Sequence, residues 1–194
     1  MESTNKLVTC PNQTVGPFFD FALTANAALG CMAGDGARGE RIRLAIRLLD
    51  GDGAPLPDAM IELWQADANG KYDHPEDRRQ TAPDPAFCGF GRLGTDAAGL
   101  CAFHTVRPGA APGPNGAPQA PHINVHVFGR GLLWHLFTRI YFAGDPANQR
   151  DPILNLVPEE RRETLLARPD PRIAGTWNFE IRLCGDRETV FFDA

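Results

Sequence analysis

The sequence lacks the features of several common protein classes. No apolar run approaches the roughly 20 residues that a membrane-spanning helix needs, and the first residues, MESTNKLVTCPNQT, hold no apolar stretch of signal-peptide length. The net charge is -5, so the composition offers no basic face for nucleic acid. We therefore expect a cytoplasmic protein that binds neither membranes nor nucleic acid.

Cysteine is also scarce. The five cysteines are an odd number, they are widely spaced, and no two form a CxxC pair, which argues against a disulfide framework or a zinc site. We interpret them as small apolar residues, buried or half-buried. They are Cys10, Cys31, Cys88, Cys101 and Cys184.

Glycine and proline, by contrast, are plentiful, at 20 and 17 residues. They separate short runs rich in Val, Ile, Leu, Phe and Trp, a pattern typical of an all-β sandwich with long loops. At 194 residues the chain suits one domain with a sizeable core. We predict an N-terminal arm with a short helical segment over residues 1–40 and a β-sandwich over residues 41–194.

Alternating or β-branched and aromatic segments mark the predicted strands. Their ranges are 41–49, 60–64, 100–106, 122–128, 136–142, 176–183 and 189–192. A long loop is expected from Asn69 to about Phe87. Residues 107–121 are too rich in Pro and Gly for a helix or a central strand. Pro158 and the acidic residues after it predict a short helix over residues 158–166.

One predicted strand carries His122, Asn124 and His126. Side chains two residues apart on a strand point to the same face. Because histidine is the commonest metal ligand, this face could form a metal or catalytic wall. The alternative is a polar face that meets solvent or a partner chain. Tyr72, in the loop after another strand, could equally be a half-buried aromatic with its hydroxyl paired.

Residues 44–72, LAIRLLDGDGAPLPDAMIELWQADANGKY, resemble the signature of the intradiol ring-cleaving dioxygenases. The similarity covers nearly the whole chain. QTVGPF at residues 13–18 resembles the family's arm motif, FHTVRPG at 103–109 resembles the segment before the active-site loop, and YFAGDP at 141–146 follows at the family's spacing. The C-terminal ETVFFD resembles the α-type chains of the family's two-subunit members.

The resemblance implies a ligand set that this chain does not complete. In the family's metal-bearing chains, two tyrosinates and two histidines hold ferric iron. Tyr72 matches the first tyrosine and His122 the first histidine. Ala111 stands at the second tyrosine and Asn124 at the second histidine. Gln119 stands at a family arginine, three residues before the first histidine. We therefore expect no iron in this chain, with Tyr72 and His122 as vestigial positions.

The other candidate metal ligands, His126 and Tyr141, do not complete the ligand set. His126 lies about 13 Å along the strand from His122, too far to bind the same ion without a bulge. Tyr141, on the next strand, has no counterpart among the family's ligands.

The resemblance also implies a role and a partner. An α-type chain would work beside a β-type subunit that holds the non-haem Fe(III), in αβ protomers of a larger assembly. The pair would cleave 3,4-dihydroxybenzoate with dioxygen to a carboxymuconate. Thr14, Gly16, Pro17 and Arg130 would line the mouth of the partner's pocket, where Arg130 could attract the substrate carboxylate. Alternatively, Arg130 is a solvated turn residue and Thr14–Pro17 an ordinary turn.

Two other functions stay open at this point. One is a self-sufficient homomeric dioxygenase with an altered ligand set. The other is a non-enzymatic binding sandwich, such as a transthyretin-like module.

Overall fold

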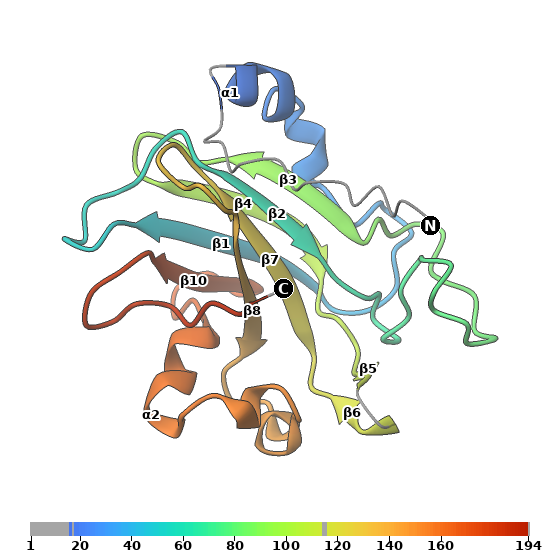
Figure 1. The fold of residues 1–194 in the computed structure, drawn as a ribbon. Coiled ribbons are helices and arrows are strands. Elements are labelled where there is room, and N and C mark those ends of the chain that lie inside the picture. Colours follow the sequence, from blue (N-terminus) through green and yellow to red (C-terminus); the bar gives the residue numbers. More distant parts are fainter. Residues whose placement is uncertain (1–15, 17, 114–115, 194) are drawn as a thin grey trace, which may run out of the picture.

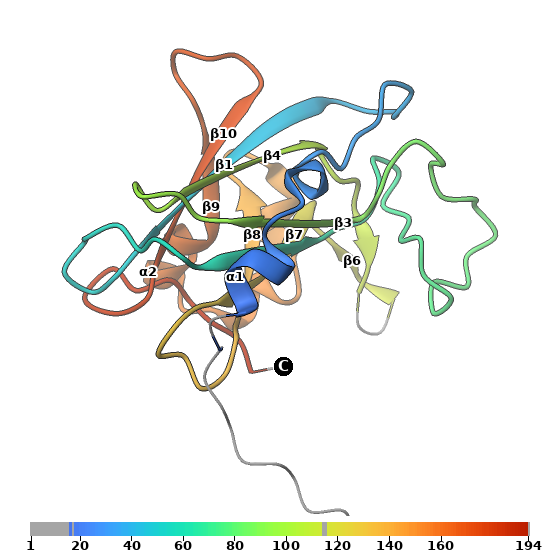
Figure 2. The ribbon, with the colours of Figure 1, turned by 90° about the horizontal axis from the view of Figure 1, so that it is seen from above.

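Two layers of β-strands pack face to face around an apolar core in the computed structural model, which describes residue 16, residues 18–113 and residues 116–193 (Figures 1 and 2). In the described residues, eight strands follow the order β3-β2-β7-β8-β9-β10-β1-β4. β9 (Leu166–Pro169) pairs with both β8 and β10, so it connects the two layers. This arrangement confirms the predicted all-β sandwich.

The other strands are bounded as follows. They are β1 (Arg41–Leu49), β2 (Met60–Trp64), β3 (Phe90–Gly94), β4 (Leu100–Val106), β7 (His122–Phe128), β8 (Leu136–Phe142) and β10 (Thr176–Arg182). A separate two-stranded ribbon holds β5 (Ala111–Pro112) and β6 (Pro118–Gln119). This ribbon lies in the Pro/Gly segment, where no central strand was expected.

Short helices lie outside the layers. They are α1 (Phe18–Leu23), η1 (Ala27–Gly30), η3 (Pro146–Arg150), η4 (Leu154–Leu156), α2 (Glu159–Arg162) and η5 (Glu163–Leu165). Figure 1 shows α1 beside β3 and α2 on the opposite side of the molecule. The segment from η3 to η5 covers one end of the outer face of β8, where Tyr141, Leu154 and Leu165 form a second apolar cluster.

Alternation along the strands builds the main core. On β1 the charged side chains Arg41, Arg43 and Arg47 point outward, and the apolar side chains that alternate with this face point inward. The inward residues of β1 and β7 are Ile42, Leu44, Ile46, Leu48, Ile123, Val125 and Val127. Complete burial of each such side chain stabilises the fold by about 1.5–3 kcal/mol. Because Ile123, Val125 and Val127 face the core, the residues that alternate with them face outward.

Six of the seven predicted strands are confirmed, the last of them ending one residue early at Arg182. The strand predicted over residues 189–192 is wrong. Its backbone amides bind three different elements: Thr189 donates to Arg182 O, Val190 to the Thr164 hydroxyl, and Phe192 to Phe137 O. Such scattered bonds form one isolated bridge at Phe192 and no ladder.

Two strands were missed. β3 contains two glycines and followed the predicted long loop, yet it pairs with β2 along its whole length. β9 begins where the predicted helix was to end, because the helical segment stops at Leu165 and Leu166 already pairs with Tyr141.

The cysteine interpretation is only partly correct. In the described residues Cys31, Cys88, Cys101 and Cys184 are all unpaired. Only Cys101 is buried, and the other three are exposed, so the expected burial is wrong for them. Cys10 lies outside the described residues.

The boundary between arm and sandwich at residue 40 stays a prediction. Cys31 and Ala33 already form bridges with His104 and Phe87, so the chain joins the sandwich before β1 begins.

Candidate functional site

The outer face of the β7–β8 pair carries three polar or aromatic cross-strand pairs. His122 lies opposite Tyr141, Asn124 opposite Arg139, and His126 opposite Phe137. The expectation that His122, Asn124 and His126 share a face therefore agrees with the alternation of buried residues on β7. Directly opposite side chains are about 4.5–5.5 Å apart at Cβ, which places Arg139 beside Asn124.

The segment after β2 brings Tyr72 to this face through buried hydrogen bonds. The Gln65 amide donates to Val106 O at 3.0 Å and accepts from the Thr105 hydroxyl at 2.8 Å. The buried Asp67 carboxylate accepts from the backbone amides of Asn69, Lys71 and Asp84. These bonds fix the turn that precedes Tyr72.

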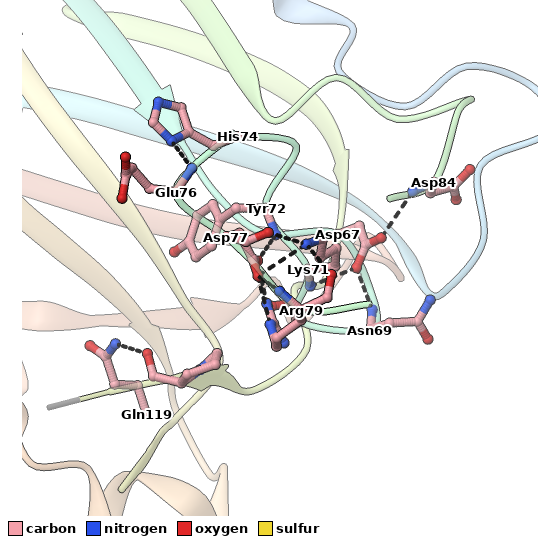
Figure 3. A network of polar contacts seen from close by, with 12 residues as sticks. Asp67, Asn69, Lys71, Tyr72, His74, Glu76, Asp77, Arg79, Asp84 and Gln119 are labelled. Carbon is pink, nitrogen blue, oxygen red and sulfur yellow. Dashed lines mark hydrogen bonds and ion pairs between the residues drawn. The ribbon is translucent and has the colours of Figure 1, made fainter. Parts of the chain in front are cut away.

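A charge network holds the next part of the loop (Figure 3). The Asp77 carboxylate accepts from the backbone amide of Tyr72 at 2.9 Å and forms an ion pair with Lys71 at 3.0 Å. Its hydrogen bonds with the Arg79 guanidinium are the main reason why the pKa of Asp77 lies below its ordinary value. Asp77 is therefore an ionised anchor for the backbone of Tyr72.

The Tyr72 side chain lies between an aromatic wall and polar groups of the sheet. Its ring stacks on Trp64, with centroids 5.9 Å apart and an interplanar angle of 16°. Burial raises the pKa of Tyr72, and the nearby Arg139 charge and a hydrogen bond with the Asn124 side chain only partly offset that rise. Tyr72 is thus a neutral phenol at physiological pH.

His122 is also neutral. It is 3% exposed, and its Nδ1 lies 2.8 Å from Ala120 O, so that nitrogen carries the proton and donates to the carbonyl. Burial, and next the charge of Arg139, lower the pKa of His122 to about 4. Beside it, burial raises the pKa of Tyr141, whose hydroxyl donates to Asp151 at 3.1 Å.

The two positions where the expected metal ligands are replaced, Ala111 and Asn124, lie in the β5–β6 ribbon and on β7. Ala111 is buried and lies opposite Gln119 in the ribbon. The loop before Ala111 packs against the turn before Tyr72, since a Cβ on Gly70 would be 1.9 Å from Ala110 O. Only glycine permits that approach, at a φ of +75°.

Gln119 connects this ribbon to β8. Its side-chain nitrogen donates to Pro112 O at 2.8 Å (Figure 3), and its side-chain oxygen accepts from Arg139 Nη1 at 2.6 Å. The site thus gathers Tyr72, Gln119, His122 and Asn124 around Arg139, with Ala111 in the adjoining ribbon.

The residues of this site do not fit a ferric ion. Ferric iron favours anionic oxygen donors, but Asn124 offers only a neutral amide. Ala111 offers no donor, and Arg139 adds a positive charge. Within the described ranges, no group of three or more His, Cys, Asp or Glu could hold a metal ion either.

A cavity of about 540 Å³ opens beside the site. It is lined by the aromatic side chains Trp64, Tyr72 and His74 and by Arg78, Arg79 and Pro112, among others. A larger cavity of about 770 Å³ lies elsewhere, over charged side chains of β1 and β10 and of the segment from α2 to η5.

Arg130, one of the residues expected at the partner's pocket, lies away from this site. Arg130, in the turn after β7, is separated from His122 by the length of that strand, about 20 Å at 3.3 Å per residue. Its guanidinium is 75% exposed and pairs with Asp58 at 2.8 Å. Gly16 is exposed, and Thr14 and Pro17 lie outside the described residues.

Sequence reasoning missed Arg139 and Trp64. Arg139 could have been found from the predicted hairpin, because its parity places it on the same face as Tyr141 and opposite the His122 strand. Trp64 stands in the quoted signature, but its stacking on Tyr72 depends on the path of an irregular loop.

Residues 15–185 match the family model described as "Dioxygenase", and the chain belongs to that family. It is 42% identical over 196 residues to the protocatechuate 3,4-dioxygenase alpha chain of Burkholderia cepacia, covering 94% of this chain and 96% of that one. The alpha chain of Pseudomonas putida is 40% identical, with coverage of 94% and 95%. The beta chain of Burkholderia cepacia is 39% identical over 158 residues, with coverage of 80% and 65%.

Solved structures agree on the fold. The dioxygenase domain of a carbohydrate-binding fusion from Streptomyces sp. SirexAA-E has a TM-score of 0.60 at 24% identity, covering 93% of this chain and 98% of that one. The 3-chlorocatechol 1,2-dioxygenase of Rhodococcus opacus 1CP has a TM-score of 0.62 at 22% identity, with coverage of 91% and 68%. The family and the fold class expected from the sequence are thereby confirmed. In the described part of the chain, no helix is long and apolar enough to cross a membrane.

Proposed function

We propose that this chain is the iron-free α-type subunit of a protocatechuate 3,4-dioxygenase and that a β-type partner holds the non-haem Fe(III). One observation carries the proposal: the chain is about 40% identical, along nearly its full length, to two alpha chains. The donor set around Tyr72 and His122, which does not fit a ferric ion, agrees with a non-metal subunit.

The reaction is the intradiol cleavage of 3,4-dihydroxybenzoate by dioxygen. Both oxygen atoms enter between the two hydroxyl-bearing carbons, and the product is 3-carboxy-cis,cis-muconate. The partner's ferric ion would supply the ligation that activates the catechol. The residues of this chain would complete the pocket mouth and the assembly of αβ protomers in the cytoplasm.

Thr14, Gly16, Pro17 and Arg130 are the residues that we assign to the mouth of the partner's pocket. Arg130 is exposed and cationic, so it can attract the substrate carboxylate before binding. Its present partner, Asp58, is also exposed, at 54%, so solvent screens that pair. A substrate carboxylate can therefore replace or join Asp58 at modest cost.

Co-expression with a β-type chain of the same organism tests the proposal. We expect oxygen uptake with protocatechuate only when both chains are present, with one iron per αβ pair. A chain that binds iron and cleaves the substrate alone would instead be a self-sufficient dioxygenase. A chain that forms no complex and changes no activity would be a separate binding module.

A further inference from the structure

Arg139 is a half-buried cation without a charged partner among the described residues. Its guanidinium donates hydrogen bonds to two neutral groups, the side-chain oxygen of Gln119 at 2.6 Å and the hydroxyl of Tyr141. Its Nε is buried without a hydrogen-bond partner, and so is Oδ1 of Asn124 on the opposite strand. Half-buried arginines normally pair with carboxylates. The absence of such a partner for Arg139 among the described residues is therefore unusual.

Arg139 is connected by strand pairing, by a hydrogen bond or by its charge to the missing and the retained positions of the family's ligand set. It lies opposite Asn124, where the second histidine is missing. It binds Gln119, where the family's arginine is missing and which pairs with Ala111 in the ribbon. Its charge also acts on both retained groups, Tyr72 and His122.

We propose that the guanidinium of Arg139 takes the place of a metal ion as the positive charge of this pocket and thereby excludes a metal. A guanidinium stays protonated at physiological pH. A ferric ion beside it would meet strong repulsion in a half-buried site, where water screens charges poorly. Iron is therefore excluded from the pocket by the charge of Arg139 as well as by the loss of the two metal ligands at positions 111 and 124.

This inference deepens the proposed function and rests on it. If the missing ligands at positions 111 and 124 were the only reason why iron is excluded, restoring them would restore iron binding. Restoring a tyrosine at position 111 and a histidine at position 124 should not restore iron binding while Arg139 remains. Removing Arg139 as well should allow it, because Tyr72 and His122 still stand in place.

Iron content of the co-expressed αβ complex tests this consequence. Four forms are compared: wild type, Ala111→Tyr/Asn124→His, the same pair with Arg139→Gln, and the same pair with Arg139→Lys. Lysine keeps the charge and serves as the matched control. We expect one iron per αβ pair in all forms except the Arg139→Gln form, which should hold a second iron and show stronger tyrosinate-to-iron absorption.

The outcomes separate the two proposals. Two irons per wild-type pair would contradict the proposed function. One iron in the wild-type pair but two in Ala111→Tyr/Asn124→His would overturn the role of Arg139 alone. An assembled Arg139→Gln form with no second iron would overturn it too.

If the Ala111→Tyr substitution prevents assembly of the αβ complex, two variants without that substitution are tested instead. Asn124→His, with and without Arg139→Gln, is titrated with Co²⁺ in the iron-loaded complex, and visible absorption reports the bound ion. Binding only in the form without Arg139 supports the inference. Equal binding in both forms, or no binding in either, refutes it.

Discussion

Burial decides the protonation of Tyr72 and His122. Burial raises the pKa of Tyr72, and the charge of Arg139 and the hydrogen bond with Asn124 only partly offset that rise. His122 stays neutral because burial and Arg139 oppose its protonation. His122 is a buried, hydrogen-bonded residue, and Tyr72 is half-buried against Trp64 at the wall of the cavity.

Replacing Tyr72 by Phe should therefore leave the complex with its full iron content and nearly unchanged kcat. The variant loses one hydrogen bond to Asn124, which contributes about 0.5–1.5 kcal/mol. Metal analysis, oxygen uptake and a thermal melt of the αβ complex measure the three effects. Loss of iron from the Tyr72→Phe complex would show that this chain holds the metal.

Arg130 is the residue of this chain that we expect to act on the substrate. Arg130→Ala should raise KM for protocatechuate about tenfold, which equals ~1.4 kcal/mol of lost binding, with kcat little changed because uniform binding is lost. Catechol lacks the carboxylate and should respond little. Steady-state kinetics at two salt concentrations measure both substrates.

Asp58→Asn is the matched control for Arg130. It removes the exposed ion pair but keeps the guanidinium, so KM for protocatechuate should stay equal or fall. Asp58 has a φ of 61°, a conformation that asparagine also tolerates, which makes a backbone change unexpected. Equal effects of Arg130→Ala on both substrates would identify Arg130 as a turn residue only.

At the scale of elements, the loop from Gln65 to Asp84 depends on ionised carboxylates. The Asp77 carboxylate accepts hydrogen bonds from Arg79 and from the Tyr72 amide and pairs with Lys71. Because the folded pKa of Asp77 lies below its unfolded value of about 3.9, ionisation favours the folded state. This contribution is complete above about pH 5 and is lost as the pH falls through the folded pKa.

Asp77→Asn should lower Tm at neutral pH and flatten its acid dependence. A hydrogen bond to a charged group contributes about 1.5–3 kcal/mol, and each kcal/mol corresponds to roughly 2–4 °C for a domain of this size. The difference from wild type should shrink below about pH 4. Asp73→Asn, at an exposed aspartate of the same loop, is the control. A constant difference across the pH range would contradict the assignment.

The strands with clear alternation could be predicted from sequence because burial of one face fixes their period. β1 and β7 are examples, and the shared face of His122, Asn124 and His126 follows from the same rule. β3 and the absence of a strand at residues 189–192 could not be predicted, since pairing with β2 and attachment to three elements are long-range effects. Arg139 was not predicted for a similar reason, because its position opposite Asn124 depends on the register between β7 and β8.

At the scale of the whole molecule, apolar side chains on the surface suggest an extensive partner interface. The large exposed ones include Leu133, Trp134, Leu156 and Ile173. Exposed apolar surface favours aggregation when its partner is absent. We expect the chain to aggregate when expressed alone and to become soluble on co-expression with the β-type chain. A stable, soluble monomer at high concentration would contradict this expectation.

The β7–β8 turn is the part of this surface that we expect at the αβ interface. Leu133 and Trp134, 61% and 66% exposed, follow Arg130 in the same turn. If Arg130 reaches the mouth of the partner's pocket, these side chains must contact the partner as well. Tryptophan at the centre of an interface commonly contributes 2 kcal/mol or more, so Trp134→Ser should weaken αβ association roughly 30-fold.

Ile173→Ser is the matched control, because Ile173 is 57% exposed in the turn between β9 and β10. That turn projects from another part of the sandwich than the turn after β7 (Figure 2). Sedimentation velocity over a dilution series gives the αβ dissociation constant of each variant. We expect a large change for Trp134→Ser and none for Ile173→Ser. If Ile173→Ser alone weakened association, the partner would bind the β9–β10 turn, and Arg130 could not reach its pocket.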